Sequence, residues 1–497
     1  MRTSSRAARL LTGLALAGIW LSACDEPPSE RAAPGTSPAG RLATGADLQD
    51  PPELVSHNGV LRTTLVVDRR KVWVGDRQLW ALTYNDRYMP PTLRVQPGDR
   101  IELAMVNRVG AKLQGVTTDT NLHTHGLHVS PRQPADDPFI SIKPGTTYHY
   151  SYQLPRDITP GTYWYHSHID MYSAAQVAGG ESGIIIVDGL RKYLPTSLRT
   201  ITEHVIALKD DQVLGDAIKI YPLSIQAKTN RTVNGQQNPV IHIRPGETQL
   251  WRLANIGANI YYKLRLKNST FYVIAQDGFP VHRIYSADTL IIPAGGRYDV
   301  LVQGGTGGIA RLETQPFYTG PAGNKFPQAN LATVITSGPS MVRARVPSLF
   351  GPLDDLSHAE ISARKTLVYT EKTNPDRFYI NGKAYNPNRV DFVSRLNTVE
   401  EWTVRNDTQE DHSFHVHTNQ FQVMSLNGKL VDPAYSWHET VNVLRGQKLV
   451  LRIRFTDFTG RTLLHCHLLN HEDRGMMAVL DIIDGRSDRE KGQNTDR

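Results

Sequence analysis

Two short sequence elements recur three times along this chain, in the same order each time. The first occupies residues 91–107, 239–255 and 393–406, and each copy ends in asparagine, so the copies are spaced by about 150 residues. The second follows in each unit, at residues 141–154, 291–304 and 442–455. Chance similarity among strands does not explain two ordered elements in three copies. The repeat therefore requires three units of the same kind.

The segments around the repeats have β character. Short runs rich in Val, Ile, Leu, Tyr and Thr alternate with Pro-Gly, Asn-Gly and Gly-Gly pairs, and no long amphipathic helical pattern stands out. A chain of 497 residues is too long for one hydrophobic core, and roughly 150 residues per domain agrees with the repeat. We predict an all-β protein of three related Greek-key β-barrel or sandwich domains, at residues 52–190, 191–345 and 346–485.

The composition limits the classes of function. With 39% hydrophobic and 21% charged residues, the chain has the values of a folded globular protein. Its formal net charge is +7, but basic and acidic residues are interleaved and no run of five or six basic residues occurs. We therefore expect no nucleic-acid partner.

The N-terminus has the features of an export signal. An arginine-bearing start precedes an apolar run that is too short to span a bilayer. The run ends in Leu-Ser-Ala-Cys at residues 21–24, which resembles the lipobox of bacterial lipoproteins. That resemblance implies a signal peptide at 1–23 and a lipid on Cys24, which anchors an exported protein at the periplasmic or extracellular face of the cell envelope. An ordinary signal with a chance cysteine is the alternative.

Two segments of the chain are predicted to lack a folded core. Residues 24–51 begin with a stretch rich in Pro, Ser, Ala and Gly and are expected to form a flexible tether, and residues 486–497 a polar tail. The chain has two cysteines, so with Cys24 assigned to the lipid, Cys466 has no disulfide partner. A metal is the commonest reason for a free thiol in an exported protein.

The pattern His-x-His occurs four times, against about 0.6 expected by chance for 18 histidines in this chain. Side chains at positions i and i+2 of a strand leave the same face, so each pair presents two imidazoles to one point. Converging pairs offer too many nitrogen ligands for one metal ion and suit a cluster of two or three. The pairs lie in the first and third units: His123 and His125, His166 and His168, His415 and His417, and His465 and His467.

Cys466 lies between the two histidines of the last pair, so strand alternation predicts that its thiolate faces away from the histidine cluster. Companion ligands for a second metal are His471, Met476 and, from the facing strand of the same unit, His412. Two histidines, one cysteine and a distant methionine make the trigonal site with weak axial sulfur that is typical of blue copper. The sequence thus predicts two metal sites joined by a Cys-His dipeptide.

Together these motifs resemble those of three-domain multicopper oxidases of the laccase type, over nearly the whole chain beyond the tether. The resemblance implies cupredoxin-like domains and four copper ions: one type 1, one type 2 and a type 3 pair. The third motif reads HSFHVHT where the family usually has HPFHLHG, but no ligand position changes. The implied ligands are His412, Cys466, His471 and axial Met476 for type 1, His123 and His415 for type 2, and His125, His166, His168, His417, His465 and His467 for type 3.

The resemblance also implies an activity, in which four single-electron oxidations of a reducing substrate are coupled to reduction of dioxygen to two waters. Electrons would enter near His471 or His412 and pass through Cys466 to its two histidine neighbours. Glu472 and Asp136 resemble the family's acidic residues near the cluster and could relay protons. A surface position or a contact that fixes a histidine tautomer is the alternative for each, and Asp137 could take the place of Asp136.

Three functional classes stay open. The first, which we predict, is a laccase-like oxidase of phenols and aromatic amines. The alternatives are a metallo-oxidase of ferrous or cuprous ions for metal tolerance and a non-enzymatic copper-binding protein of the envelope. Only eight Met and no Met-rich insert disfavour cuprous ion, and ferrous oxidation would need carboxylates beside His471 or His412. Every ligand position is filled, which disfavours the third class. We expect a monomer whose partners are dioxygen and a small-molecule or metal-ion donor.

Overall fold

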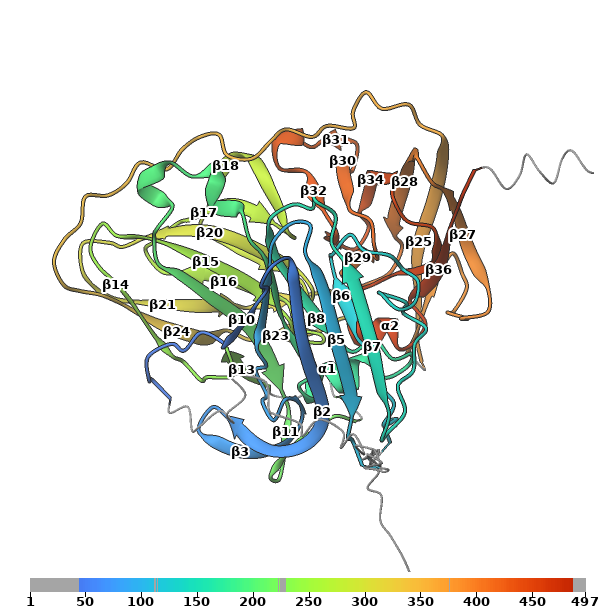
Figure 1. The fold of residues 1–497 in the computed structure, drawn as a ribbon. Coiled ribbons are helices and arrows are strands. Elements are labelled where there is room, and N and C mark those ends of the chain that lie inside the picture. The colour runs from blue at the N-terminus through green and yellow to red at the C-terminus, as the bar shows by residue number, and fades with distance from the viewer. Residues whose placement is uncertain are drawn as a thin grey trace, which may run out of the picture. The chain divides into compact units, whose positions relative to one another are not determined.

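A computed structural model of the chain describes residues 44–110, 113, 115–221, 223, 229–374 and 376–485 (Figure 1). The predicted signal peptide, Cys24, most of the tether and the polar tail lie outside the described residues. All the described residues belong to one compact unit. Within them, no helix has the length and hydrophobicity needed to cross a membrane.

Strands dominate the described residues, which confirms the all-β prediction. The first sandwich packs a five-stranded sheet, β1-β4-β9-β8-β6, on a six-stranded sheet, β11-β12-β3-β2-β5-β7, around buried residues such as Leu65, Leu103, Tyr152 and Ile185. The strands are β1 (Glu53–Val55), β2 (Val60–Val74), β3 (Arg77–Tyr84), β4 (Thr92–Val95), β5 (Arg100–Asn107), β6 (His123–His125), β7 (Thr147–Gln153), β8 (Gly161–His166), β9 (Ser182–Val187), β11 (Val213–Leu214) and β12 (Ala217–Ile218).

The second sandwich packs a six-stranded sheet, β13-β10-β15-β20-β17-β18, on a five-stranded sheet, β14-β24-β21-β16-β19, and carries the hairpin β22-β23. Its strands are β10 (Glu203–Asp211), β13 (Asn230–Val233), β14 (Val240–Ile243), β15 (Thr248–Asn255), β16 (Tyr262–Leu266), β17 (Phe271–Gln276), β18 (Phe279–Ala287), β19 (Leu290–Ile292), β20 (Arg297–Gln303), β21 (Gly308–Gln315), β22 (Phe317–Tyr318), β23 (Lys325–Phe326) and β24 (Ala329–Thr336).

The third sandwich packs the sheet β26-β25-β28-β34-β30-β31, with β32 paired to β30, on the sheet β27-β36-β35-β29-β33. One continuous apolar cluster fills the second and third sandwiches. The strands are β25 (Ala363–Thr373), β26 (Asp376–Ile380), β27 (Val390–Arg395), β28 (Thr398–Asn406), β29 (His412–Val416), β30 (Phe421–Leu426), β31 (Lys429–Leu430), β32 (Trp437–His438), β33 (Thr440–Val443), β34 (Lys448–Phe455), β35 (Gly460–His465) and β36 (Met477–Ile483).

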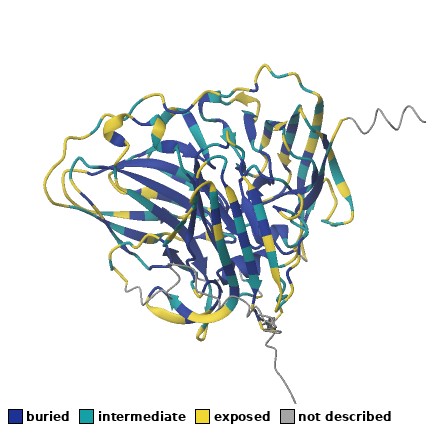
Figure 2. Ribbon diagram, in the orientation of Figure 1, coloured by how far each residue is buried: buried dark blue, intermediate teal, exposed yellow. Residues whose placement is uncertain are grey.

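Helical segments are short and lie between strands. Buried residues run mainly along the strands, whereas exposed residues gather in loops and at sheet edges (Figure 2). Because β11 and β12 join a sheet of the first sandwich although they follow residue 191, the predicted domain boundaries stay a prediction. The helical segments are α1 (Ser173–Gly179), α2 (Leu469–Glu472) and the 3₁₀ turns η1 (Leu190–Tyr193), η2 (Thr196–Leu198) and η3 (Pro433–Tyr435).

The two repeated elements occupy equivalent places in the three sandwiches. The first ends in β5, β15 and β28, each of which pairs in parallel with β2, β10 or β25. The second contains β7, β20 and β34, which pair antiparallel with β5, β15 and β28. The sequence repeat is therefore a repeat of strand topology.

The asparagine that ends the first element, at Asn107, Asn255 and Asn406, is fully buried in all three sandwiches. Each side-chain amide donates to two backbone carbonyls, and each side-chain oxygen accepts the backbone N–H two residues on. A buried amide is tolerated when its donors and acceptor are all satisfied. In the third sandwich the acceptors are the carbonyls of Glu410 and Val443, at 2.9 and 2.8 Å, so Asn406 fixes the loop that precedes β29.

The last residues of the predicted tether differ from the prediction. The backbone N–H of Leu48 donates to the carbonyl of Val240 at 2.7 Å, and an Asp50 oxygen accepts the N–H of Val205 at 2.8 Å. Backbone pairing at the edge of β14 satisfies polar groups that a free tether would leave to water. Residues 46–50 are therefore part of the folded unit.

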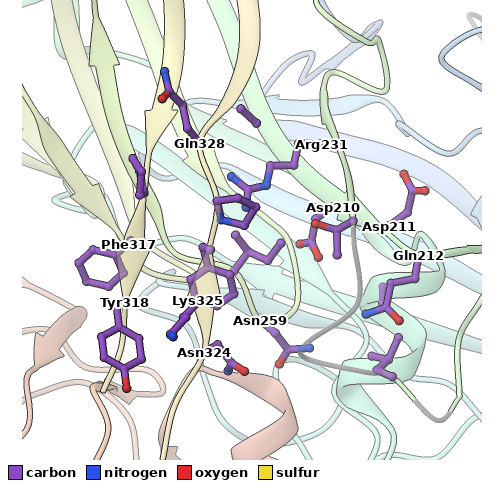
Figure 3. A pocket seen from close by; sticks show the side chains of 18 of the residues that line it. Asp210, Asp211, Gln212, Arg231, Asn259, Phe317, Tyr318, Asn324, Lys325 and Gln328 are labelled. Carbon is purple, nitrogen blue, oxygen red and sulfur yellow. The ribbon is translucent and has the colours of Figure 1, made fainter. Parts of the chain in front are cut away.

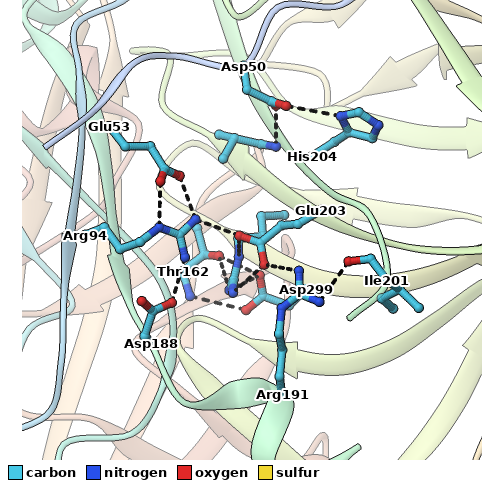
Figure 4. A network of polar contacts seen from close by, with 12 residues as sticks. Asp50, Glu53, Arg94, Thr162, Asp188, Arg191, Ile201, Glu203, His204 and Asp299 are labelled. Carbon is cyan, nitrogen blue, oxygen red and sulfur yellow. Dashed lines mark hydrogen bonds and ion pairs between the residues drawn. The ribbon is translucent and has the colours of Figure 1, made fainter. Parts of the chain in front are cut away.

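A buried ion-pair network joins the first sandwich to the second (Figure 4). Glu203 lies 2.8 Å from Arg94 and 2.9 Å from Arg252, and Asp299 accepts the Thr162 hydroxyl at 2.5 Å. Although burial opposes its charge, Arg252 and Arg94 hold the pKa of Glu203 well below its usual value. These contacts dock β20 against β8, the strand that ends at His166.

Candidate metal centre

All the predicted ligand side chains are buried, and His471 is the most exposed of them at 4%. The four histidine pairs lie at or just after strand ends. Antiparallel strand pairing places one histidine pair opposite another in each of the two outer sandwiches. In the first sandwich His123 of β6 lies opposite His166 of β8, and in the third His415 of β29 lies opposite His465 of β35. The strand register thus brings side chains that are distant in sequence to one place.

The histidine pairs form one cluster in which rings from the first and third sandwiches stack. The ring centroids of His123 and His417 are 3.8 Å apart, and those of His125 and His415 are 3.9 Å apart. Three groups have ligand atoms within 4.8 Å of one another: His125, His166 and His467; His168, His417 and His465; and His123, His415 and His417. Each group takes histidines from both outer sandwiches.

A separate group contains Cys466. Its Sγ lies 3.5 Å from Nδ1 of His412 and 3.9 Å from Nδ1 of His471, and these two nitrogens are 3.0 Å apart. The helical turn α2, between β35 and β36, returns the chain so that His471 lies beside Cys466. Met476 is buried, and its carbonyl accepts the N–H of Cys466 at 3.1 Å. As alternation predicts, Cys466 and its histidine neighbours belong to different groups.

The outer nitrogens of several histidines are already held, which fixes the inner nitrogen for a ligand. Nδ1 of His123 lies 2.9 Å from Asp136, Nδ1 of His166 lies 2.8 Å from the carbonyl of Ser167, and Nε2 of His412 lies 2.9 Å from the hydroxyl of Thr408. The remaining Nε2 atoms of His123, His125, His166 and His415 are buried and have no hydrogen-bond partner. Burial lowers the pKa of these imidazoles, so they are neutral, as metal ligands must be.

The matches with known proteins span the three sandwiches. Residues 67–191, 207–306 and 359–486 each match a sequence family described as multicopper oxidase. The chain belongs to the multicopper oxidase family. Copper binding and copper-dependent oxidoreductase chemistry follow from that membership, and the donor set of nitrogens and one sulfur fits copper.

The relatives of this multicopper oxidase have different roles. The chain is 24% identical to the multicopper oxidase mco of Staphylococcus aureus, over 81% of this chain and 83% of that one. It is 28% identical to the cell division protein FtsP of Edwardsiella tarda, over 79% and 83%. Among solved structures, a multicopper oxidase from Campylobacter jejuni described as a metallo-oxidase matches with a TM-score of 0.77 and 25% identity, over 89% and 96%.

Both predicted acids lie against the histidine cluster. Of the two aspartates in PADDPF, Asp136 is the one that contacts His123, whereas Asp137 accepts the backbone N–H of Phe139. Glu472 places Oε2 3.0 Å from Nδ1 of His465 and Oε1 3.6 Å from Nε2 of His168. The acids therefore lie on ligands that come from different sandwiches.

Three further charged residues lie at the two sites, and sequence analysis missed them. Glu439 and Arg297 contact His125, and Glu410 lies 3.6 Å from Nε2 of His471. Arg297 is in the second repeated element of the middle unit, which has no His-x-His motif and therefore suggested no metal site. Glu410 is four residues after the repeated Asn406, a spacing that could have drawn attention to it.

Copper binding at the Cys466 group should release a proton. Burial raises the pKa of the Cys466 thiol to about 12 and lowers the pKa of His412 to about 3, so near neutrality only the thiol carries a displaceable proton. The affinity for copper(II) should therefore fall about tenfold for each pH unit lowered, between about pH 5 and 8. Chelator competition, read from the blue absorption, measures the slope, and a slope near zero would contradict a protonated thiol.

Proposed function

We propose that this multicopper oxidase takes single electrons from a reduced metal cation, ferrous ion above all, and couples four of them to the reduction of dioxygen to two waters. Copper, when bound, supplies the one-electron transfers and the binding of dioxygen. The ligand assignment that we propose is His412, Cys466, His471 and axial Met476 for type 1, His123 and His415 for type 2, and His125, His166 and His467 with His168, His417 and His465 for the type 3 pair.

The separation of the two groups supports the coupling. The Cys466 group is the only predicted site that contains sulfur, and the peptide bonds from Cys466 to His465 and His467 lead directly into the cluster. A donor can then be oxidised at one place while dioxygen is reduced at another, which reconciles one-electron donors with a four-electron acceptor.

Reduction of dioxygen to two waters also consumes four protons. Burial raises the pKa of Asp136 to about 8, so this acid holds a proton near neutrality in the metal-free protein. Although burial opposes its charge, His168 and His465 hold the pKa of Glu472 below its usual value. Two carboxyl groups with opposite protonation states at one cluster are suited to hold and accept protons.

The position of Glu410 supports a metal cation as the electron donor. Its carboxyl lies 3.6 Å from Nε2 of His471, the nitrogen that points away from Cys466. Burial, and then the negative charge of Glu371 and Asp376, raises the pKa of Glu410 to about 9. A cation bound between carboxylates that repel one another reduces this repulsion, so the site favours a cation. A ferrous ion held here would be in contact with the ligand that receives its electron.

The surroundings of His471 favour a small donor over a bulky one. The ring of Phe378 stacks on His471 with centroids 4.1 Å apart, and the loop between β22 and β23 lies over Glu410. That approach is so close that a Cβ on Gly323 would lie 3.0 Å from the Cβ of Glu410. The likeness to the Campylobacter jejuni metallo-oxidase supports the same donor class.

The variant Glu410→Gln tests the donor. Because the carboxylate that holds the cation is lost, oxygen uptake with ferrous ion should fall by about 30-fold or more in kcat/KM, whereas uptake with a phenol should change by less than about twofold. Asp411→Asn is the matched control, since Asp411 is the neighbouring buried acid but accepts the backbone N–H of Arg445 instead. Equal losses with both donors, or none with ferrous ion, would exclude the metal-ion role.

A second candidate function is the oxidation of phenols and aromatic amines, which an adjoining cavity favours. The cavity has a volume of 840 Å³, with Phe317 and Tyr318 on one side and Asp210 and Asp211 on another (Figure 3). Asn470, the residue before His471, also lines it. An apolar wall with a few polar groups suits a small aromatic molecule. Faster turnover with a phenol than with ferrous or cuprous ion would favour this candidate.

The remaining expectations from the sequence stay proposals. A non-enzymatic role in the cell envelope is disfavoured because every proposed ligand is present. Export and a lipid on Cys24 at the cell envelope rest on the N-terminal sequence. The monomeric state stays a proposal. Mass spectrometry of the mature N-terminus tests the lipid.

A further inference from the structure

Glu439 lies against the histidine cluster and contacts other ligands than Asp136 and Glu472 do. It is between β32 and β33 and is completely buried. Its Oε1 lies 3.2 Å from Nδ1 of His125, and its Oε2 lies 2.9 Å from Nδ1 of His415. One carboxylate thus touches a proposed ligand from the first sandwich and another from the third.

Arg297 of the second sandwich pairs with this carboxylate. It is also completely buried, and its Nη1 contacts Oε1 of Glu439 and the carbonyl of Gly295, the latter at 2.7 Å. Its Nε donates to the carbonyl of Thr162 at 3.2 Å. A Cβ on Gly126, which has φ 88°, would lie 2.6 Å from Nη2 of Arg297, so this backbone position requires glycine. The guanidinium is therefore held firmly in place.

We propose that Glu439, held by Arg297, is a positioning residue that sets the tautomers of His125 and His415 and thereby turns their Nε2 atoms toward the copper cluster. This inference rests on the copper assignments of the proposed function.

The hydrogen-bonding roles of a carboxylate and an imidazole explain this positioning. An ionised carboxylate only accepts, so a neutral imidazole beside it keeps its proton on Nδ1 and leaves a lone pair on Nε2. The Nε2 atoms of His125 and His415 are buried and have no hydrogen-bond partner. At His125, an amide at position 439 can instead donate to Nδ1, which would move the ring proton to Nε2 and block a metal bond. At His415, the backbone carbonyl of Glu439 also lies 3.0 Å from Nδ1 and supports the same tautomer. Arg297 compensates for the buried negative charge.

The pair also gives the second sandwich a part in the cluster. The described residues of that sandwich supply none of the proposed ligands, yet Arg297 reaches the ring of His125, with Nη1 3.3 Å from Nδ1. Cluster formation then depends on all three sandwiches, because Glu439 touches ligands of the first and third sandwiches and its charge is balanced by Arg297 of the second.

Copper affinity of purified Glu439→Gln and Arg297→Gln, measured by chelator competition, tests this inference. Both variants should lose about 10- to 100-fold in affinity for cluster copper while they keep the blue absorption of the Cys466 group. Glu400→Gln is the matched control. Glu400 is a buried acid of the third sandwich whose side chain pairs with Lys365 at 2.5 Å and accepts from Ser394 at 2.9 Å and from Trp402 at 3.0 Å, none of which is a proposed ligand. This control should bind copper as the wild type does.

The outcomes separate this inference from the assignment beneath it. A blue Glu439→Gln protein whose cluster affinity is within about twofold of the wild type would overturn the positioning role. If that variant fails to fold, Arg297→Gln decides by the same criterion. If the wild-type protein holds no copper in the cluster, the ligand assignment of the proposed function fails, and the positioning role fails with it.

Discussion

Replacing Cys466 with serine should remove the blue absorption and reduce turnover to background with every donor. Cys466 places its sulfur within 4 Å of His412 and His471, and a serine hydroxyl provides neither a thiolate nor its soft donor character. The residue is also the covalent link to His465 and His467. Absorption spectroscopy and oxygen uptake on the same preparation measure both losses.

The matched control for that variant is Met477→Leu. Met477 is buried in the same segment and packs in a small apolar cluster, so a swap of similar volume should cost less than about 1.5 kcal/mol and leave colour and turnover intact. The serine variant should still load copper in the histidine cluster, since none of those groups contains sulfur. A serine variant that is blue and active would refute the assignment of Cys466.

The variant Glu472→Gln should slow turnover by about 100-fold or more while the type 1 site stays reducible. Glutamine keeps the size of the side chain but cannot carry a proton. The carbonyl of Cys466, 3.0 Å from Nδ1 of His465, still accepts from that nitrogen and keeps the ring tautomer in the variant. Anaerobic bleaching of the blue colour by a donor should therefore be as fast as in the wild type. Reoxidation by dioxygen should be the step that slows, and stopped-flow absorption follows both.

A buried acid that touches no ligand provides the comparison for Glu472. Glu181 accepts the hydroxyl of Thr120 at 2.7 Å, and burial raises its pKa to about 8. Glu181→Gln should leave reoxidation unchanged within about twofold. Unchanged reoxidation in Glu472→Gln as well would remove Glu472 from the proton path.

The predicted ligands came from local rules that a sequence displays directly. Alternation of side chains along a strand places His465 and His467 together and Cys466 opposite. In the structure both histidines belong to the histidine cluster, whereas Cys466 lies with His412 and His471. The repeated elements likewise became strands with the same pairing in each sandwich, since hydrophobic patterns and turn residues act over a few positions. The end of the predicted tether could not be predicted in this way, because the pairing of residues 46–48 with β14 depends on a partner nearly two hundred positions away.

The sequence by itself determined the fold class, the repeat and the set of histidine, cysteine and methionine side chains, because spacing of one or two residues decides on which face of a strand a side chain lies. Only the tertiary structure decided which charged groups surround those ligands. Glu439 meets Arg297 across 142 positions and Glu410 meets His471 across 61, and such contacts leave no periodicity in the chain. They arise from the packing of separate sandwiches, which buries a charge only where another segment supplies its counterpart.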